Sequence, residues 1–196
     1  MNGKGLLLVL VDPAPALEEE LNDWYDTEHL PERAAVAGFE TARRFTSLGD
    51  GPRYAAIYDL ASLDVLQGDA YLAVSGGNFS PWTRRVTSRT HPTRMTAEQI
   101  GTRQAITGPC NRLLLLKIRK ESDSDLADVA AGVEASFSGQ SGFLQTRVFA
   151  GVEPQPNFII AIAEFSAAAL PPIELEAFGD CGKRLSLAAS YRPYRS

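Results

Sequence analysis

The chain has 196 residues, 44% of them hydrophobic, which is enough apolar material for one large domain or two small ones around a packed core. Its formal net charge of −5 argues against nucleic acid as a bulk partner. No apolar run approaches the roughly 20 residues that span a bilayer, and the Met1 region lacks signal-peptide features. We therefore expect a cytoplasmic protein without a membrane partner.

Hydrophobic periodicity predicts two similar series of elements in chain order. In the first series we expect strands at 5–11, 39–48, 54–60 and 93–100, and helices at 15–30 and from 63 onward, the latter broken at Gly76-Gly77 and resumed at Ser80-Pro81. In the second we expect strands at 112–119, 143–152, 158–165 and 188–194, with helices at 123–137 and 172–185.

A gapless alignment of the two series indicates a tandem repeat. The segment GFETARRF at 38–45 aligns with GFLQTRVF at 142–149, an offset of 104 residues, and the same offset pairs Tyr54 with Phe158. We therefore divide the chain into an N-terminal repeat, residues 1–105, and a C-terminal repeat, residues 106–196.

The order strand, helix, strand, strand, helix, strand is typical of the ferredoxin-like fold, an antiparallel sheet with two helices on one face. The strands at 6–11 and 158–163 are apolar without alternation, so both faces of each sheet should be buried. We therefore predict an α+β fold in which two ferredoxin-like repeats pack their antiparallel sheets face to face as an α+β barrel. One chain would form it as an internal pseudo-dimer, or the swapped halves of a homodimer would.

The helix at 15–30 carries the richest chemistry of the chain. Trp24 and Tyr25 lie on its apolar face, Glu28 falls in the middle of that face, and His29 lies at its edge. Because Pro31 disfavours a continuing helix, we expect the helix to end or kink near His29. The terminal carbonyls and Asp26 would then keep the pKa of His29 near or above neutrality, which suits general acid/base catalysis. The alternative is a surface histidine at a helix end.

The second repeat lacks this site, since residues 123–137 contain no His, Trp or Tyr. Arg43 recurs as Arg147, whereas Val148 takes the place of Arg44. Strand alternation turns Arg44 away from Arg43, so Arg44 would reach the helix side and pair with Glu28 or bind a substrate anion. The alternative is an arginine that faces solvent. We expect one pocket, in the first repeat.

Further aromatic residues are candidates for the pocket walls, although aromatic residues on such faces more often belong to the core. Gly76-Gly77-Asn78 predicts a mobile loop that covers the pocket. A role for the loop residue His91, and for the basic run of Arg84, Arg85 and Arg89, stays open. The candidate substrate-binding residues are Trp24, Arg44, Tyr54, Tyr58 and Trp82.

The segment WYDTEHLP at 24–31, followed by Gly38-Phe39, RRF at 43–45 and YAAIY at 54–58, resembles the EthD-type proteins of the dimeric α+β barrel superfamily. The resemblance covers roughly residues 3–100. It implies a pocket between the helices and the sheet of one repeat. The superfamily includes polyketide cyclases, cofactor-free monooxygenases, isomerases, lyases and haem enzymes, so the resemblance implies a fold more than a reaction.

Cofactor motifs are absent from the sequence. It contains no P-loop, no dinucleotide-binding glycine pattern and no Gly-x-Ser-x-Gly elbow. Two histidines cannot build a multi-histidine metal site, although together with carboxylates they could bind a metal weakly. The acidic neighbours of His29 do not suit haem, although a single axial ligand leaves haem open. We expect no cofactor and no metal.

These observations predict a cofactor-independent enzyme of the lyase, isomerase, cyclase or decarboxylase type, whose partner is a small aromatic or polyketide-like carbonyl compound. His29 would transfer the proton, Glu28 or Asp26 would orient it, Tyr25 would donate to an oxyanion, and Arg44 would hold an anionic group. The alternatives are a non-catalytic small-molecule-binding or accessory protein and a cofactor-free monooxygenase.

Overall fold

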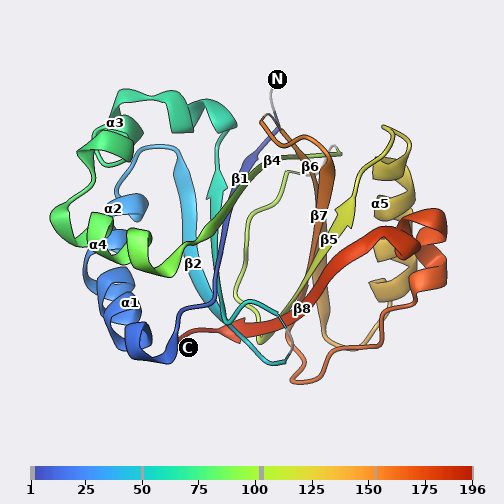
Figure 1. Cartoon of the computed structure of the whole chain (residues 1–196). Coiled ribbons are helices and arrows are strands. Elements are labelled where there is room, and N and C mark those ends of the chain that lie inside the picture. The colour runs from blue at the N-terminus through green and yellow to red at the C-terminus, as the bar shows by residue number, and fades with distance from the viewer. Residues whose placement is uncertain (1–2, 50, 102–103, 153, 196) are drawn as a thin grey trace.

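Eight strands form one closed barrel in the order β1-β3-β2-β8-β5-β7-β6-β4, and every pairing between them is antiparallel (Figure 1). The computed structural model describes residues 3–49, 51–101, 104–152 and 154–195. The strands are β1 (Gly5–Val11), β2 (Phe39–Ser47), β3 (Tyr54–Leu60), β4 (Thr93–Gln99), β5 (Arg112–Arg119), β6 (Phe143–Gly151), β7 (Phe158–Phe165) and β8 (Leu185–Pro193).

The barrel consists of two four-stranded groups with the same internal order, β4-β1-β3-β2 and β8-β5-β7-β6. The groups join edge to edge at two short seams, each three residue pairs long. One seam pairs residues 45–47 of β2 with 191–193 of β8, and the other pairs 97–99 of β4 with 149–151 of β6. The α+β barrel is therefore closed within one chain. The two sheets that were predicted to face each other are also joined at their edges. The repeat boundary near residue 105 stays a prediction.

The two groups share local details. Gly38 and Gly142 both have a positive φ, 93° and 76°, immediately before β2 and β6, and an irregularity in register follows in each strand. The offset of 104 residues is wrong for the next strand, however. Thr46 pairs with Tyr54 and Ala150 pairs with Ile159, so Ile159, and not Phe158, occupies the position that corresponds to Tyr54. The second hairpin is one residue longer.

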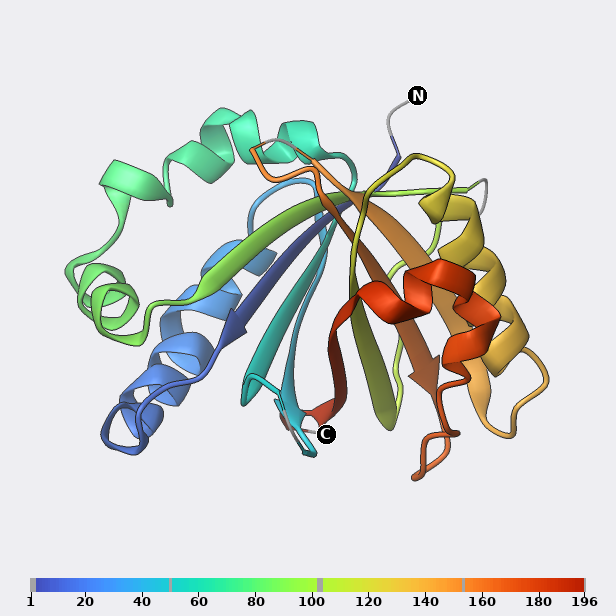
Figure 2. The same cartoon turned by 45° about the vertical axis from the view of Figure 1, so that its right-hand side comes forward.

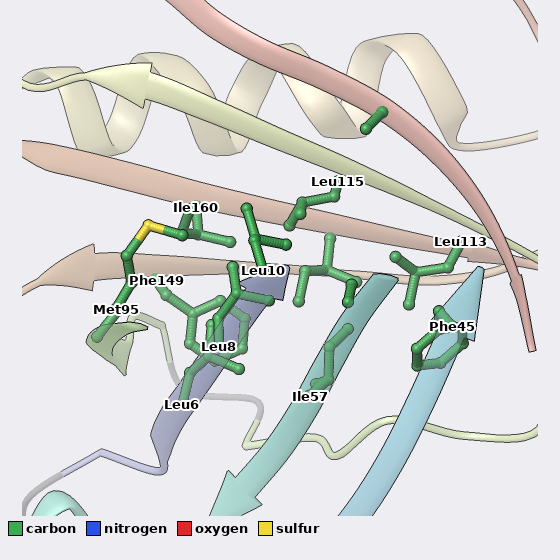
Figure 3. Packing of buried hydrophobic residues seen from close by; sticks show 14 of the residues in the cluster. Leu6, Leu8, Leu10, Phe45, Ile57, Met95, Leu113, Leu115, Phe149 and Ile160 are labelled. Atoms are coloured by element: carbon green, nitrogen blue, oxygen red, sulfur yellow. The ribbon is translucent and has the colours of Figure 1, made fainter. Parts of the chain in front are cut away.

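The barrel interior is filled by aliphatic and aromatic side chains from both groups of strands, including Leu8, Ile57, Leu115 and Ile160 (Figure 3). Each fully buried side chain of this kind contributes about 1.5–3 kcal/mol to stability. The outer faces of β1, β3 and β7 are buried as well, under helices. This arrangement confirms the prediction, made from the missing alternation, that both faces of these strands are covered.

Helices cover the outside of the barrel on two sides (Figures 1 and 2). The first half carries a helix from α1 (Glu18–Trp24) to α2 (Leu30–Ala34), together with α3 (Asp69–Leu72) and α4 (Pro81–Thr90). The second half carries α5 (Asp125–Phe137). The helix predicted at 172–185 is instead a 3-10 segment, Leu175–Arg184, broken at Gly179, where φ is 55° and ψ is −135°. Within the described ranges, no helix combines the length and apolar character that crossing a bilayer requires.

A buried ion cluster fastens the connection between the halves. Arg147, whose side chain is 0% exposed, pairs with Asp59 of the first half and with Glu164 of the second. The backbone N–H groups of Thr107 and Gly108 donate to the same two carboxylates, at 2.8 and 2.9 Å. One guanidinium therefore lies between two buried carboxylates, offsets part of their negative charge, and holds both the connecting segment and the two halves together.

We expect Arg147→Met to lower the free energy of unfolding by about 3–5 kcal/mol, because the substitution leaves two buried carboxylates without their cation. Urea denaturation followed by circular dichroism measures this loss. Arg119→Met is the matched control, since the Arg119 side chain is 66% exposed and pairs with the exposed Glu121. A loss below about 1 kcal/mol for Arg147→Met would contradict the assigned role of the cluster.

Candidate active site around His29

The helix that carries the candidate site does not end at His29. A π-helical segment, Tyr25–His29, follows α1, and its widened turn leads directly into α2, so the helix continues to Ala34. Of the two outcomes predicted near His29, a helix end or a kink, the helix end is wrong, because Pro31 lies in the first turn of α2, where the missing N–H is tolerated, and the irregularity is the π-helical segment itself. Segments of π-helix occur frequently at functional sites.

A cavity of about 100 Å³ lies between this helix, α4 and the outer face of β1 and β3. Leu7 and Val9 of β1 line it, as do Tyr58 of β3 and Phe79, which precedes α4. The helix contributes Trp24, Tyr25, His29 and Arg33. The structure thus brings together four of the predicted residues, Trp24, Tyr25, His29 and Tyr58, in the place that the family resemblance implies.

His29 lies in an aromatic and apolar environment. Its ring stacks on Trp24, with centroids 4.2 Å apart, and contacts the edge of Tyr25 at 5.4 Å. Its Nδ1 is buried and has no hydrogen-bond partner among the residues that the structure describes. Burial, followed by the positive charges of Arg33 and Arg44, lowers the pKa of His29 to about 3. The expectation of a pKa near neutrality is therefore wrong, and the imidazole is neutral at physiological pH.

Two phenols accompany the imidazole. Burial raises the pKa of Tyr25 to about 12 and raises the pKa of Tyr58 as well. The Tyr58 hydroxyl interacts with Tyr25 but makes no well-formed hydrogen bond with the described residues. Both phenols are therefore neutral. The cavity offers a neutral imidazole and neutral O–H donors, with little water to compete for them.

Glu28 does not face the cavity. Its carboxylate accepts hydrogen bonds from the hydroxyls of Ser80, at 2.5 Å, and Thr83, at 2.9 Å, and the Thr83 hydroxyl accepts one from the indole of Trp24. These bonds tie the helix to the first turn of α4. The predicted pairing of Glu28 with Arg44 is wrong, because the hydroxyl groups of α4 already satisfy the carboxylate.

Arg44 lies on the helix side of β2, as strand alternation predicts, but behind Tyr25 and outside the cavity. Its guanidinium lies 4.1 Å from the ring centroids of both Tyr25 and Tyr194. It donates to Asn22 at 2.7 Å and pairs with Asp26 at 3.3 Å. Asp26 is therefore the partner of an arginine and does not orient His29.

The remaining candidates also lie outside the cavity. The Tyr54 hydroxyl accepts a hydrogen bond from Asn22 and donates to Glu18, and Trp82 does not line the cavity. His91 lines a separate cleft. Of the basic run, Arg85 and Arg89 pair with Glu20, and Arg84 donates to Gly77.

The sequence analysis missed Arg33, Tyr71, Phe79, Pro92 and Arg94, which also line the cavity. Arg33 is buried, donates to the carbonyl of Val74 at 2.8 Å and lies 5.1 Å from the Tyr71 ring centroid. The spacing of His29 and Arg33, four residues apart, would have indicated a shared face had the helix been expected to continue.

Comparison with solved structures shows the fold. The chain is similar to an anthrone oxidase-like protein (TM-score 0.68, 11% identity, 100% of this chain and 92% of the other covered). It is similar to a proposed monooxygenase from Lactobacillus acidophilus, with a TM-score of 0.60 and 12% identity over 98% of this chain and 94% of the other. It is also similar to a haem-binding protein from Thermus thermophilus, with a TM-score of 0.54 and 10% identity over 100% of this chain and 92% of the other. No protein-family model and no curated protein sequence matches the chain. These likenesses show the fold alone, a closed antiparallel barrel with helices on its outside.

The likeness to a haem-binding protein raises the question whether this chain suits haem. Residues 106–196 contain no histidine, and Phe137, Phe165 and Phe178 fill the space between α5 and the second sheet. The cavity at His29 is smaller than the roughly 300–1,000 Å³ of sites that accept drug-sized ligands, and a tetrapyrrole is at least drug-sized. The residues present do not fit haem.

The depressed pKa of His29 predicts a specific pH dependence of stability. Between about pH 6.5 and pH 3 the unfolded chain binds a proton at this residue and the native state does not, so stability falls as the pH falls. The slope from this one group is at most about 1.4 kcal/mol per pH unit. Urea denaturation across this range measures it, and His29→Gln is expected to remove its share. NMR titration of the imidazole above pH 5 would contradict the assignment if it showed protonation there.

Proposed function

We propose that the cavity around His29 is the reaction site of an enzyme that transfers a proton within a small carbonyl compound and needs no organic cofactor. The observation that carries the proposal is the buried, neutral imidazole whose Nδ1 lacks a partner among the described residues, set in an apolar cavity beside two neutral phenols. A buried polar atom without a partner is costly, and a bound molecule that hydrogen-bonds to it removes that cost.

The volume indicates the size of the compound. An engineered protein cavity of about 150 Å³ binds benzene, so a partly open cavity of about 100 Å³ suits a single ring. A larger substrate requires a lining residue such as Phe79 to move, and the two glycines of the adjoining 3-10 segment Gly76–Asn78 give the backbone before Phe79 the freedom to do so.

The chemistry follows from the protonation states. The neutral imidazole accepts a proton from a carbon next to the carbonyl group, and the electron pair of the C–H bond moves to the carbonyl oxygen. The phenol of Tyr25 or Tyr58 donates a hydrogen bond to the oxyanion that develops. Imidazolium is unfavourable in this cavity on its own, but the enolate formed beside it supplies the opposite charge. Returning the proton at a second carbon completes an isomerisation.

A cofactor-free monooxygenase is the second candidate, and the names of the structural neighbours favour it, since one is anthrone oxidase-like and another is a proposed monooxygenase. The first step is shared, because removal of the proton gives an electron-rich carbanion that then transfers electrons to oxygen. Non-catalytic binding is the remaining alternative. The EthD-type assignment, the cytoplasmic location and the choice between monomer and homodimer stay predictions.

We expect His29→Gln to reduce kcat by about 10²- to 10⁴-fold on a single-ring carbonyl substrate, because the general base is lost. Tyr58→Phe should reduce it less, by roughly tenfold, since a second phenol remains. Deuterium exchange at the acidic carbon, followed by NMR, measures proton transfer directly. His91→Gln is the matched control, because His91 lies in a different cleft. Unchanged exchange in His29→Gln would contradict the proposal.

An oxygen electrode separates the two candidate reactions. Proton transfer alone consumes no oxygen, whereas oxygenation consumes it in proportion to product. A compound that binds in the cavity, with neither deuterium exchange nor oxygen uptake, would instead support the non-catalytic alternative.

A further inference from the structure

We infer that a second, separate cleft on this protein binds a small oxyanion, a carboxylate or phosphate group, between Arg43, Arg44 and Arg195. This arginine cleft measures about 220 Å³ and lies at the seam where β2 meets β8. Its other lining residues include Asp26, Gly108 and Tyr194. Three guanidinium groups and one carboxylate give it a local net charge of +2.

The single carboxylate of the cleft is already shared. Asp26 pairs with Arg44 at 3.3 Å and with Arg195 at 2.9 Å. Arg43 makes no ion pair and no hydrogen bond with the described residues, although its side chain is only partly exposed. Arg44 is nearly fully buried, and its Nε has no hydrogen-bond partner in the described part of the chain. Arg43 and Arg44 leave opposite faces of β2, yet both line the cleft, and each retains N–H donors that suit the planar geometry of a carboxylate or phosphate.

The opposite seam shows that this charge is not a requirement of the fold. There Val148 occupies the place of Arg44, since residue 44 accepts a backbone hydrogen bond from Tyr194 and residue 148 accepts the corresponding one from Ile100. Arg147 occupies the place of Arg43, and Asp59 and Glu164 neutralise it. Only the β2–β8 seam combines an unpaired arginine with a second, buried one, among the described residues of both seams.

The buried cluster of Asp59, Glu164 and Arg147 has a formal charge of −1, so the cleft and this neighbouring cluster together keep a positive charge of +1. Burial raises the pKa of the adjacent Cys110 thiol to about 11, so the thiol is neutral. Glu164, behind Gly108, is held by Arg147, Gln145 and the Gly108 N–H. Leu30, Ala42, Phe45 and Pro193 supply apolar walls beside the arginines, so the cleft has room for a short apolar body attached to the oxyanion.

This cleft is distinct from the cavity of the proposed function. Tyr25 separates the two, since it lines the His29 cavity and stacks on Arg44 at 4.1 Å. The inference therefore does not depend on the reaction proposed above. The arginine cleft and the His29 cavity are coupled electrostatically, however. Arg44 is one of the charges that lower the pKa of His29, so an anion bound against Arg44 should raise that pKa.

Isothermal titration calorimetry at low salt tests the inference, with inorganic phosphate and benzoate as probes. We expect saturable binding of one anion per chain, weakened roughly tenfold or more in Arg43→Gln, because one charge-assisted pair is lost. Arg43 makes no ion pair and no side-chain hydrogen bond within the described ranges, so this variant should fold, as circular dichroism verifies. Arg119→Gln is the charge-matched control and should bind as the wild type does.

The outcomes separate the possible sources of the anion. Binding of phosphate alone identifies a phosphate ligand, binding of benzoate alone identifies a carboxylate with an apolar body, and binding of both supports the shared oxyanion chemistry. His29→Gln should bind as the wild type does, which keeps this test independent of the proposed reaction. Saturable binding should also raise the imidazole pKa of His29 in NMR titrations. Absence of saturable binding by both probes, or equal affinity in Arg43→Gln, would overturn the inference.

Discussion

Closure of the barrel through two short seams is the constraint on which the rest of the structure depends. Each seam has only three residue pairs, yet the two seams join two four-stranded sheets into one closed barrel, and apolar side chains fill its interior. Because side chains fill the interior, a ligand site has to lie outside the barrel, under the helices, or at the seams themselves. The His29 cavity lies under the helices, and the arginine cleft lies at a seam.

Burial, and not the end of a helix, sets the pKa of His29. A helix terminus would have stabilised imidazolium, whereas the continuing helix places the ring between Trp24 and Tyr25 and near two arginines. The same desolvation keeps the phenols protonated. The imidazole and both phenols thus remain uncharged until a substrate brings a developing charge of its own, and fixed donors shielded from bulk water then stabilise that charge.

The two halves differ most where their charges differ. In the second half the guanidinium of Arg147 is fully used to hold the chain together, and aromatic side chains fill the space under α5. In the first half, the corresponding Arg43 is unpaired among the described residues, and the helix covers a cavity. The same strand arrangement therefore supports a space filled by aromatic side chains under α5 and a cavity under the helix of the first half, and Val148 takes the place of Arg44.

The sequence by itself determined the strands, their order and the burial of both sheet faces, because apolar periodicity and turn residues such as Gly38 and Gly142 are local signals. It also placed Trp24, Tyr25, His29 and Tyr58 on one site. Only the tertiary structure decided that the helix passes through Pro31, that Glu28 binds the hydroxyls of α4, and that Asp26 belongs to Arg44. The positions of the two carboxylates depend on partners 18 to 55 residues away. A local pattern indicates which side chains face inward, but the partner that satisfies each charge is set by packing between distant segments.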